Sequence, residues 1–290
     1  MDIDEIQALI GLLDDPDEQV FEQVKDKIVS LGEDIIPSLE GAWEENSFGP
    51  LYLERIEDII HNIQFDNVEA RLRQWALYER DDLLAGAMLI ARYQYPDLDE
   101  DEVRDQINKI RQDIWLELND NLTSFEKVKV MNHILFDVHG FTGNKKNYHA
   151  PQNSYLNEVL QTKKGNPLSL SVIYQVLAES LDIPIKGVNL PNHFILAYQH
   201  LQEETNKPGE TEKRVLFYVN PFSKGAILGK SEIDMFLKQL ELDPKPSYYE
   251  PCTPVQVIVR KLNNLIYSYK KLGYVDKVEE LTRLLDAVTN

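Results

Sequence analysis

The chain of 290 residues contains a single cysteine, Cys252, and this scarcity excludes two kinds of architecture. No internal disulfide framework can form, and no cluster of thiolates can hold a metal ion. The absence of disulfides is typical of a reducing compartment, so we expect a cytoplasmic location. No stretch approaches the roughly 20 apolar residues needed to span a bilayer, and the acidic opening residues differ from a basic secretory signal. We expect neither a membrane span nor a targeting segment.

Positive charge is also scarce, because 30 Lys and Arg residues face 49 Asp and Glu residues and leave a net charge of −19. Such a chain repels phosphate backbones and anionic lipid surfaces. We therefore expect no nucleic-acid and no membrane partner. Charge instead favours a protein or peptide partner that presents a basic surface.

Recognisable cofactor motifs are missing as well. The central histidines, His133, His139 and His149, have spacings that match no metal-ligand motif, and Gly-rich phosphate motifs are absent. We predict no metal and no cofactor.

The first 115 residues show a helical pattern throughout, with apolar residues three or four positions apart, as at Val20, Val24 and Ile28. The paired helices predicted here resemble a HEAT-type repeat unit, in which neighbouring helices bury one another's apolar faces. An ordinary helical bundle explains the same pattern equally well. The length of the chain allows roughly two domains, or one domain with a helical extension.

A different pattern follows, in which helices give way to short apolar runs rich in β-branched and aromatic residues. We predict a helix over 168–181 with Asn166 as its N-cap, and then antiparallel strands over 185–190, 193–198 and 215–219. The last part returns to helix. Its two predicted helices, 255–272 and 275–288, resemble a tetratricopeptide-like hairpin.

The predicted fold class is therefore α+β, with a mostly helical amino-terminal domain, a core with a small antiparallel sheet, and a carboxy-terminal helical hairpin. The predicted domain ranges are 1–115, 116–243 and 244–290.

The region between 165 and 222 combines a helix start, a histidine that opens a strand and a polar residue that ends the next strand. Its motifs Gly165-Asn166-Pro167, Pro191-Asn192-His193-Phe194 and Asn220-Pro221-Phe222 resemble the transglutaminase-like core of the SirB1 family. The resemblance covers about residues 125–287 and implies a transglutaminase-like, papain-like core.

In the wider transglutaminase-like superfamily, a Cys starts the helix, a His opens a strand and an Asp ends the following strand. The resemblance implies that His193 matches the histidine, that Asn220 matches the orienting residue and that Pro167 stands where the Cys is expected. Proline has no nucleophile, but it suits the first helical position after an Asn cap. A transglutaminase or cysteine-protease activity is therefore disfavoured. Cys252, in a Pro-rich joint, is more simply a small buried group.

Two functions remain open, and whether the chain is an enzyme stays undecided. The first is a degenerate transglutaminase-like protein that lacks the catalytic Cys and acts in the cytoplasm as a peptide-binding, protein-binding or scaffold protein. The alternative is an amide or ester hydrolase that uses Ser169, His193 and Asn220. Ser169 has a simpler explanation, because a Ser near a helix start commonly bonds the backbone.

Candidate binding residues lie in the polar loop before the core and around the helix start. Asn153 and Ser154 have a simpler alternative role as caps of a helix at Tyr155. The full set comprises Asn144, Asn147, Tyr148, Asn153, Ser154, Asn166, Pro167 and Asn192.

Overall fold

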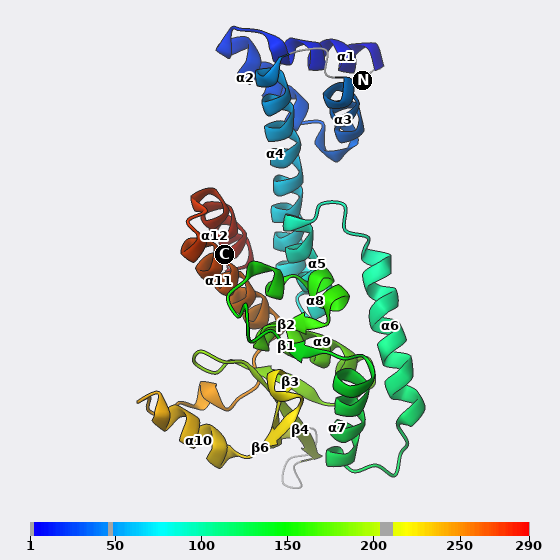
Figure 1. The fold of residues 1–290 in the computed structure, drawn as a ribbon, viewed down its shortest axis with the longest axis vertical. Helices are drawn as coiled ribbons and strands as arrows, with labels where there is room; N and C mark the ends of the chain where they lie inside the picture. Colours follow the sequence, from blue (N-terminus) through cyan, green and yellow to red (C-terminus); the bar gives the residue numbers. More distant parts are fainter. Residues whose placement is uncertain (1–2, 46–48, 204–210, 290) are drawn as a thin grey trace. The chain divides into compact units, whose positions relative to one another are not determined.

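The computed structural model describes residues 3–45, 49–203 and 211–289 (Figure 1). Long helices and two small sheets make up these residues, so the fold class is α+β, as the sequence predicts. Contacts divide the chain into two compact units, Met1–Arg73 and Gln74–Asn290. The expected domains, 1–115, 116–243 and 244–290, do not coincide with this division and stay a prediction.

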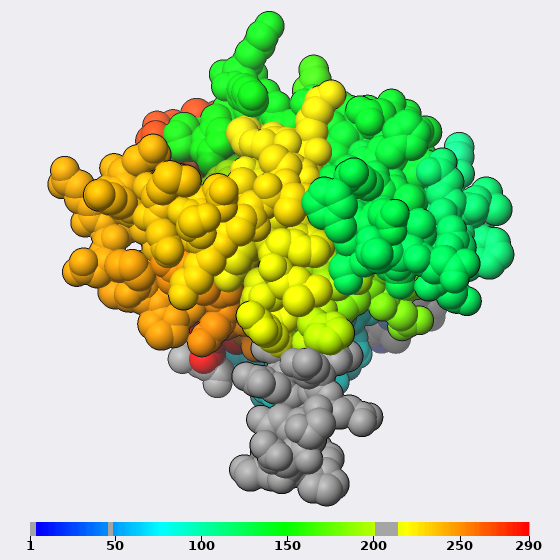
Figure 2. All heavy atoms as spheres, turned by 90° about the horizontal axis from the view of Figure 1, so that it is seen from below, coloured from blue at the N-terminus to red at the C-terminus, as the bar shows by residue number. Residues whose placement is uncertain are grey.

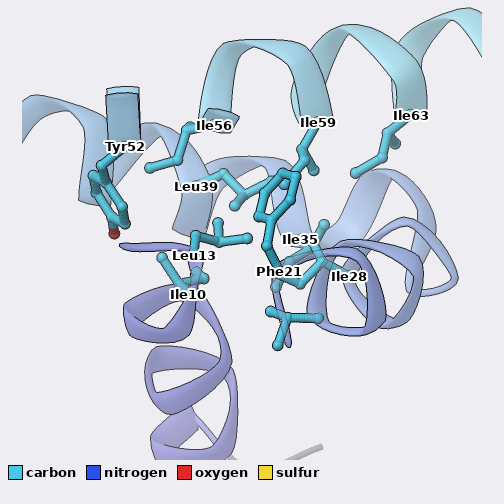
Figure 3. Packing of buried hydrophobic residues seen from close by; sticks show 11 residues of the cluster. Ile10, Leu13, Phe21, Ile28, Ile35, Leu39, Tyr52, Ile56, Ile59 and Ile63 are labelled. Carbon is cyan, nitrogen blue, oxygen red and sulfur yellow. The ribbon is translucent and has the colours of Figure 1, made fainter. Parts of the chain in front are cut away.

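The first unit is a small helical assembly. Its helices are α1 (Ile3–Gly11), α2 (Glu18–Val29), α3 (Ile36–Glu45) and α4 (Pro50–Gln74), with single 3-10 turns η1 (Leu12–Asp14) and η2 (Gly32–Ile35) between the first three. Apolar residues spaced three or four apart face one another and exclude water, as Figure 3 shows for Leu39, Ile56 and Ile59. This burial supplies the main stabilisation of the unit.

Arg55 of α4 is a charged residue inside this apolar setting, with 8% of its surface exposed. Its guanidinium donates from Nη1 to the Leu13 carbonyl at 2.7 Å and to the Asp15 carbonyl at 3.0 Å. It also lies 3.9 Å from the centre of the Phe21 ring and 3.2 Å from a carboxylate oxygen of Glu18. Arg55 thereby satisfies carbonyls at the turn between α1 and α2, which would otherwise lack partners.

The second unit contains most of the remaining helices. These are α5 (Leu83–Gln94), α6 (Glu100–Glu117), α7 (Ser124–Asn132), α8 (Leu156–Thr162), α9 (Pro167–Glu179), α10 (Lys230–Gln239), α11 (Pro254–Leu272) and α12 (Val275–Thr289). None of the helices in the described ranges is long and apolar enough to cross a membrane.

The main sheet of this unit is antiparallel and has the strand order β3-β4-β5-β6. Its strands are β3 (Ile185–Val188), β4 (Ile195–Glu203), β5 (Thr211–Asn220) and β6 (Ala226–Leu228). The first three confirm the strands predicted from the sequence, whereas β6 was not predicted because three residues carry too little pattern. A short parallel pair, β1 (Thr142–Gly143) with β2 (Lys164–Gly165), ties the polar loop to the start of α9.

Two helices pack on the main sheet, one on each face, and hold its strands in position. α9 packs against β3 and β4, while α10 packs on the residues Ile195, Ala197 and Tyr218 of the other face. Seen from below in Figure 2, the yellow residues around β6 lie against the green residues of the α7 region. There the Asn132 side chain donates to the Gly225 carbonyl at 2.8 Å. Gly225 has a positive φ of +72°, and a Cβ at this position would collide with Asn132.

Lys261 of α11 is fully buried, and its Nζ has no hydrogen-bond partner within the described residues. Burial lowers the pKa of this amine to about 7, because the charged form loses its hydration. The lysine therefore sheds its proton far more readily than an exposed one.

We expect Arg55→Met to weaken the first unit by about 2 kcal/mol, because the carbonyls of Leu13 and Asp15 lose charge-assisted hydrogen bonds. Amide hydrogen exchange in α2 measures this free energy of opening. The control is Arg73→Met in the same helix, whose side chain is exposed and which should change it by less than about 0.5 kcal/mol. Equal effects of the two substitutions would contradict the role assigned to Arg55.

We expect Lys261 to make stability rise with pH. Between about pH 7 and pH 10 the unfolded lysine stays protonated while the folded one does not, so the free energy of unfolding gains up to about 1.4 kcal/mol per pH unit. Lys261→Met should remove this slope and raise stability at pH 7. Urea denaturation followed through the buried Trp75 tests it, with the exposed Lys270→Met as control. An unchanged slope in Lys261→Met would refute the assignment.

Candidate functional site

A cavity of about 400 Å³ lies at the start of α9. The polar loop before α8, the first turn of α9, the turn into β4 and one side of α11 form its walls. The lining residues are Tyr148, His149, Ala150, Ser154, Asn166, Pro167, Leu168, Asn192, His193, Phe194, Arg260, Asn264, Tyr267 and Ser268. The structure thus brings five of the eight predicted binding residues, and His193, to one cavity.

The start of α9 is built as the sequence predicts. Asn166 is the N-cap, since its Oδ1 accepts a hydrogen bond from the Ser169 N–H at 2.8 Å. Its Nδ2 donates to Ser154 Oγ at 2.9 Å, which ties the preceding loop to the helix. Pro167 follows at the first helical position and lines the cavity. The residue at this wall therefore initiates a helix and offers no nucleophile.

Ser169 lies behind this wall. Only 1% of its surface is exposed, it does not line the cavity, and its Oγ has no hydrogen-bond partner within the described ranges. The expected backbone bond is therefore wrong for Ser169. Ser171 makes it instead, donating to the Pro167 carbonyl at 2.8 Å. No hydrogen bond joins Ser169 to His193 in the described part of the chain, so the pairing that a Ser hydrolase needs is not formed here.

His193 lies in the turn that enters β4. Its ring packs between Phe222 and Phe236, with ring centres 6.4 and 6.1 Å away. Burial lowers the pKa of the imidazole, and the positive charge of Arg260 lowers it further, while the nearby side chain of Asn220 opposes both effects. The lowered pKa means that His193 is neutral at pH 7.

Asn220 ends β5 beside this imidazole. The turn that follows holds it in place, since the Gly225 N–H donates to the Asn220 carbonyl at 2.9 Å. Asn220 Oδ1 is buried and has no hydrogen-bond partner in the described part of the chain. His193 and Asn220 together line a second cavity, of about 390 Å³, with apolar walls that include Phe236. An amide here can orient the ring but cannot offset a positive charge on it.

Three of the predicted binding residues shape the loop without lining the cavity. Asn153 donates from Nδ2 to the carbonyls of Asn147 and Tyr148, at 2.6 and 3.2 Å, and accepts from Asn144 at 2.9 Å. The alternative role of Asn153 and Ser154 as caps of α8 is wrong, because no side chain caps that helix. These bonds hold Tyr148 at the cavity, where its ring meets Phe222 edge-on at 5.7 Å.

Sequence reasoning missed the wall that α11 contributes. Arg260, Asn264 and Tyr267 lie four and then three residues apart, so they share one side of the helix. The prediction for α11 used only its apolar stripe. The polar stripe beside it is the sequence signal that would have indicated this wall of the cavity.

Cys252 has no part in this cavity. Its thiol donates to the Gly187 carbonyl at 3.2 Å, and burial raises its pKa to about 12. The thiol is therefore protonated at pH 7 and is not the activated thiolate that a cross-linking reaction needs. Within the described residues, no group of His, Cys, Asp and Glu side chains is placed to hold a metal ion.

We expect the imidazole of His193 to titrate below its ordinary pKa of 6.5, because burial penalises the charged ring. Asn220→Ala should lower this pKa further and Arg260→Gln should raise it. NMR titration of the histidine rings measures these shifts, with the exposed Arg214→Gln as a control for general loss of positive charge. An imidazole pKa at or above 6.5 would overturn the description of this site.

Comparison with known proteins finds a matching family model and several relatives. A family model described as the transglutaminase-like superfamily matches residues 101–263. A UPF0162 protein of Xylella fastidiosa is 38% identical over 114 residues, which are 39% of this chain and 41% of that protein. A UPF0162 protein of Pasteurella multocida is 30% identical over 171 residues, 59% of this chain and 58% of that protein.

A human protein, F-box only protein 21, is 30% identical over 154 residues, 53% of this chain and 23% of its own length. The chain thus matches less than two thirds of each of these relatives. No solved structure matches. Because the family model covers more than half of the residues, the chain belongs to the transglutaminase-like superfamily.

Proposed function

We propose that this chain is a degenerate transglutaminase-like protein of the SirB1 type, which binds a peptide or protein segment in the cytoplasm and acts as a scaffold. The observation that carries the proposal is Pro167. It lines the cavity at the start of α9, where the superfamily's thiol is expected, beside an imidazole with a lowered pKa.

The dimensions and chemistry of the cavity suit a peptide. About 400 Å³ accommodates one or two side chains or a chain end, and hydroxyls, amides and aromatic rings mix along its walls. Tyr148 and Tyr267 lie at 36% and 50% exposure, so both rings are accessible to a partner. The net charge of −19 attracts a partner whose wider surface is basic.

Helical segments precede and follow the core in the sequence, and they fit a scaffold role. The amino-terminal helices resemble a HEAT-type unit, and α11 with α12 resembles a tetratricopeptide-like hairpin. Helix pairs of these kinds commonly present binding surfaces.

The hydrolase alternative has less support. It needs a hydroxyl within hydrogen-bond reach of a base, whereas the Ser169 Oγ is buried without a partner in the described part of the chain. The Asn220 amide also lacks the charge that would stabilise an imidazolium.

We expect the full chain, immobilised as bait, to retain one cellular protein reproducibly, and Tyr148→Ala and His193→Ala each to weaken that retention by about tenfold, because both remove cavity contacts. Tyr78→Ala, which truncates a tyrosine 80% exposed and outside the cavity, is the matched control and should retain the partner fully. The measurement is the affinity of each variant for the purified partner. Recovery of chaperones alone, or equal binding by all variants, would count against the proposal.

A further inference from the structure

The charge of the cavity is opposite to that of the chain. Although 49 of the 290 residues are Asp or Glu, no Asp or Glu is among the described residues that line it. Arg260 lines it, and the neighbouring cavity of about 330 Å³ that shares Arg260 and Asn264 likewise has no acidic residue in its described lining. In a chain this acidic, an acid-free wall around an arginine is a local departure that needs an explanation.

Arg260 is partly buried and has no acidic partner in the described part of the chain, which distinguishes it from Arg55 and Arg92. Arg55 and Arg92 each lie within 3.3 Å of a glutamate oxygen. Arg260 instead donates from Nη1 to the Asn189 amide oxygen at 3.2 Å, and within the described ranges it forms no ion pair. A guanidinium offers five N–H donors, and within the described ranges only the bond to Asn189 uses one of those of Arg260.

Burying the Arg260 charge without a counter-charge is energetically unfavourable. Burial lowers the pKa of Arg260. Burial raises the pKa of Tyr148 and lowers that of His193, and the Arg260 charge opposes the first shift and adds to the second. A partly buried charge of this kind is compensated when an anion binds beside it.

Other donors converge on the same space. Leu168 lines the cavity in the first turn of α9, where its N–H has no carbonyl partner in its own helix. The positive end of the α9 dipole points the same way. The side chains of Asn192, Asn264 and Tyr267 add further N–H and O–H donors to the walls.

We propose that this cavity binds a peptide through a carboxylate group, held by the Arg260 guanidinium beside the first turn of α9. The inference rests on the proposed peptide-binding function and names what that site recognises. A planar carboxylate matches the guanidinium with two parallel hydrogen bonds. One cation beside a neutral imidazole balances one negative charge, whereas a phosphate dianion would leave one charge uncompensated in an acidic protein.

The overall acidity does not prevent this recognition. At physiological salt, charges more than about 8 Å apart across solvent are largely screened, so the local charge decides what enters the cavity. Basic residues elsewhere in the same peptide would meet the acidic exterior.

The test uses three pools of N-acetylated tripeptides on the full chain. The first contains neutral residues and a free terminal carboxylate, the second is the same pool with amidated ends, and the third is amidated with Glu at its centre. Binding is measured by ligand-observed NMR, with inorganic phosphate as a separate probe. We expect the first or third pool to bind at least about tenfold more tightly than the second, and the choice between them tells a terminal carboxylate from a side-chain one.

Arg260→Gln should remove this preference, Arg260→Lys should weaken it through loss of the paired hydrogen bonds, and Arg214→Gln on the surface should leave it intact. Thermal unfolding confirms that each variant folds. If the second pool, which has no carboxylate, binds as tightly as the first and third pools, the carboxylate inference is overturned and the peptide-binding function stands. Binding of phosphate alone would also overturn it. If no pool binds, the peptide-binding function fails together with the inference.

Discussion

The side chain of Asn166 is the interaction on which the rest of the site depends. Its carbonyl oxygen caps α9 at the Ser169 N–H, and its amide group donates to Ser154 in the preceding loop. One side chain thus fixes both where the helix begins and where the loop lies. If the cap were absent, the loop and the helix would no longer share a rigid point of attachment, and the cavity between them would lose its shape.

The same helix start is the basis for the proposed loss of the superfamily's thiol chemistry. A Cys at the first turn of a helix gains reactivity from the helix dipole and a nearby imidazole. Pro167 gives up that chemistry and gains a preset φ suited to helix initiation. The imidazole of His193 stays beside it, packed between aromatic rings, with its pKa lowered mainly by burial.

The charge around the cavity of the second unit differs from the net charge of the whole chain. The chain is strongly acidic, yet the described cavity lining has no acidic side chain and includes an arginine. Lys261, one residue after Arg260, points elsewhere and is buried with a pKa near 7. Two adjacent basic residues of α11 therefore lie in different environments, because successive side chains on a helix point about 100° apart.

Features that depend on neighbours along the chain could be predicted from the sequence. The α+β class, the strands from Ile185 to Asn220 and the Asn166 cap with Pro167 follow from apolar period and capping chemistry, both of which are local.

Tertiary structure alone decided the rest. It placed α11 against α9 and so brought Arg260 to the cavity, it buried the Ser169 hydroxyl outside the lining of that cavity, and it gave Asn153 a role in bracing the loop. These outcomes depend on residues tens of positions apart, and a local pattern carries no information about which distant surfaces pack together.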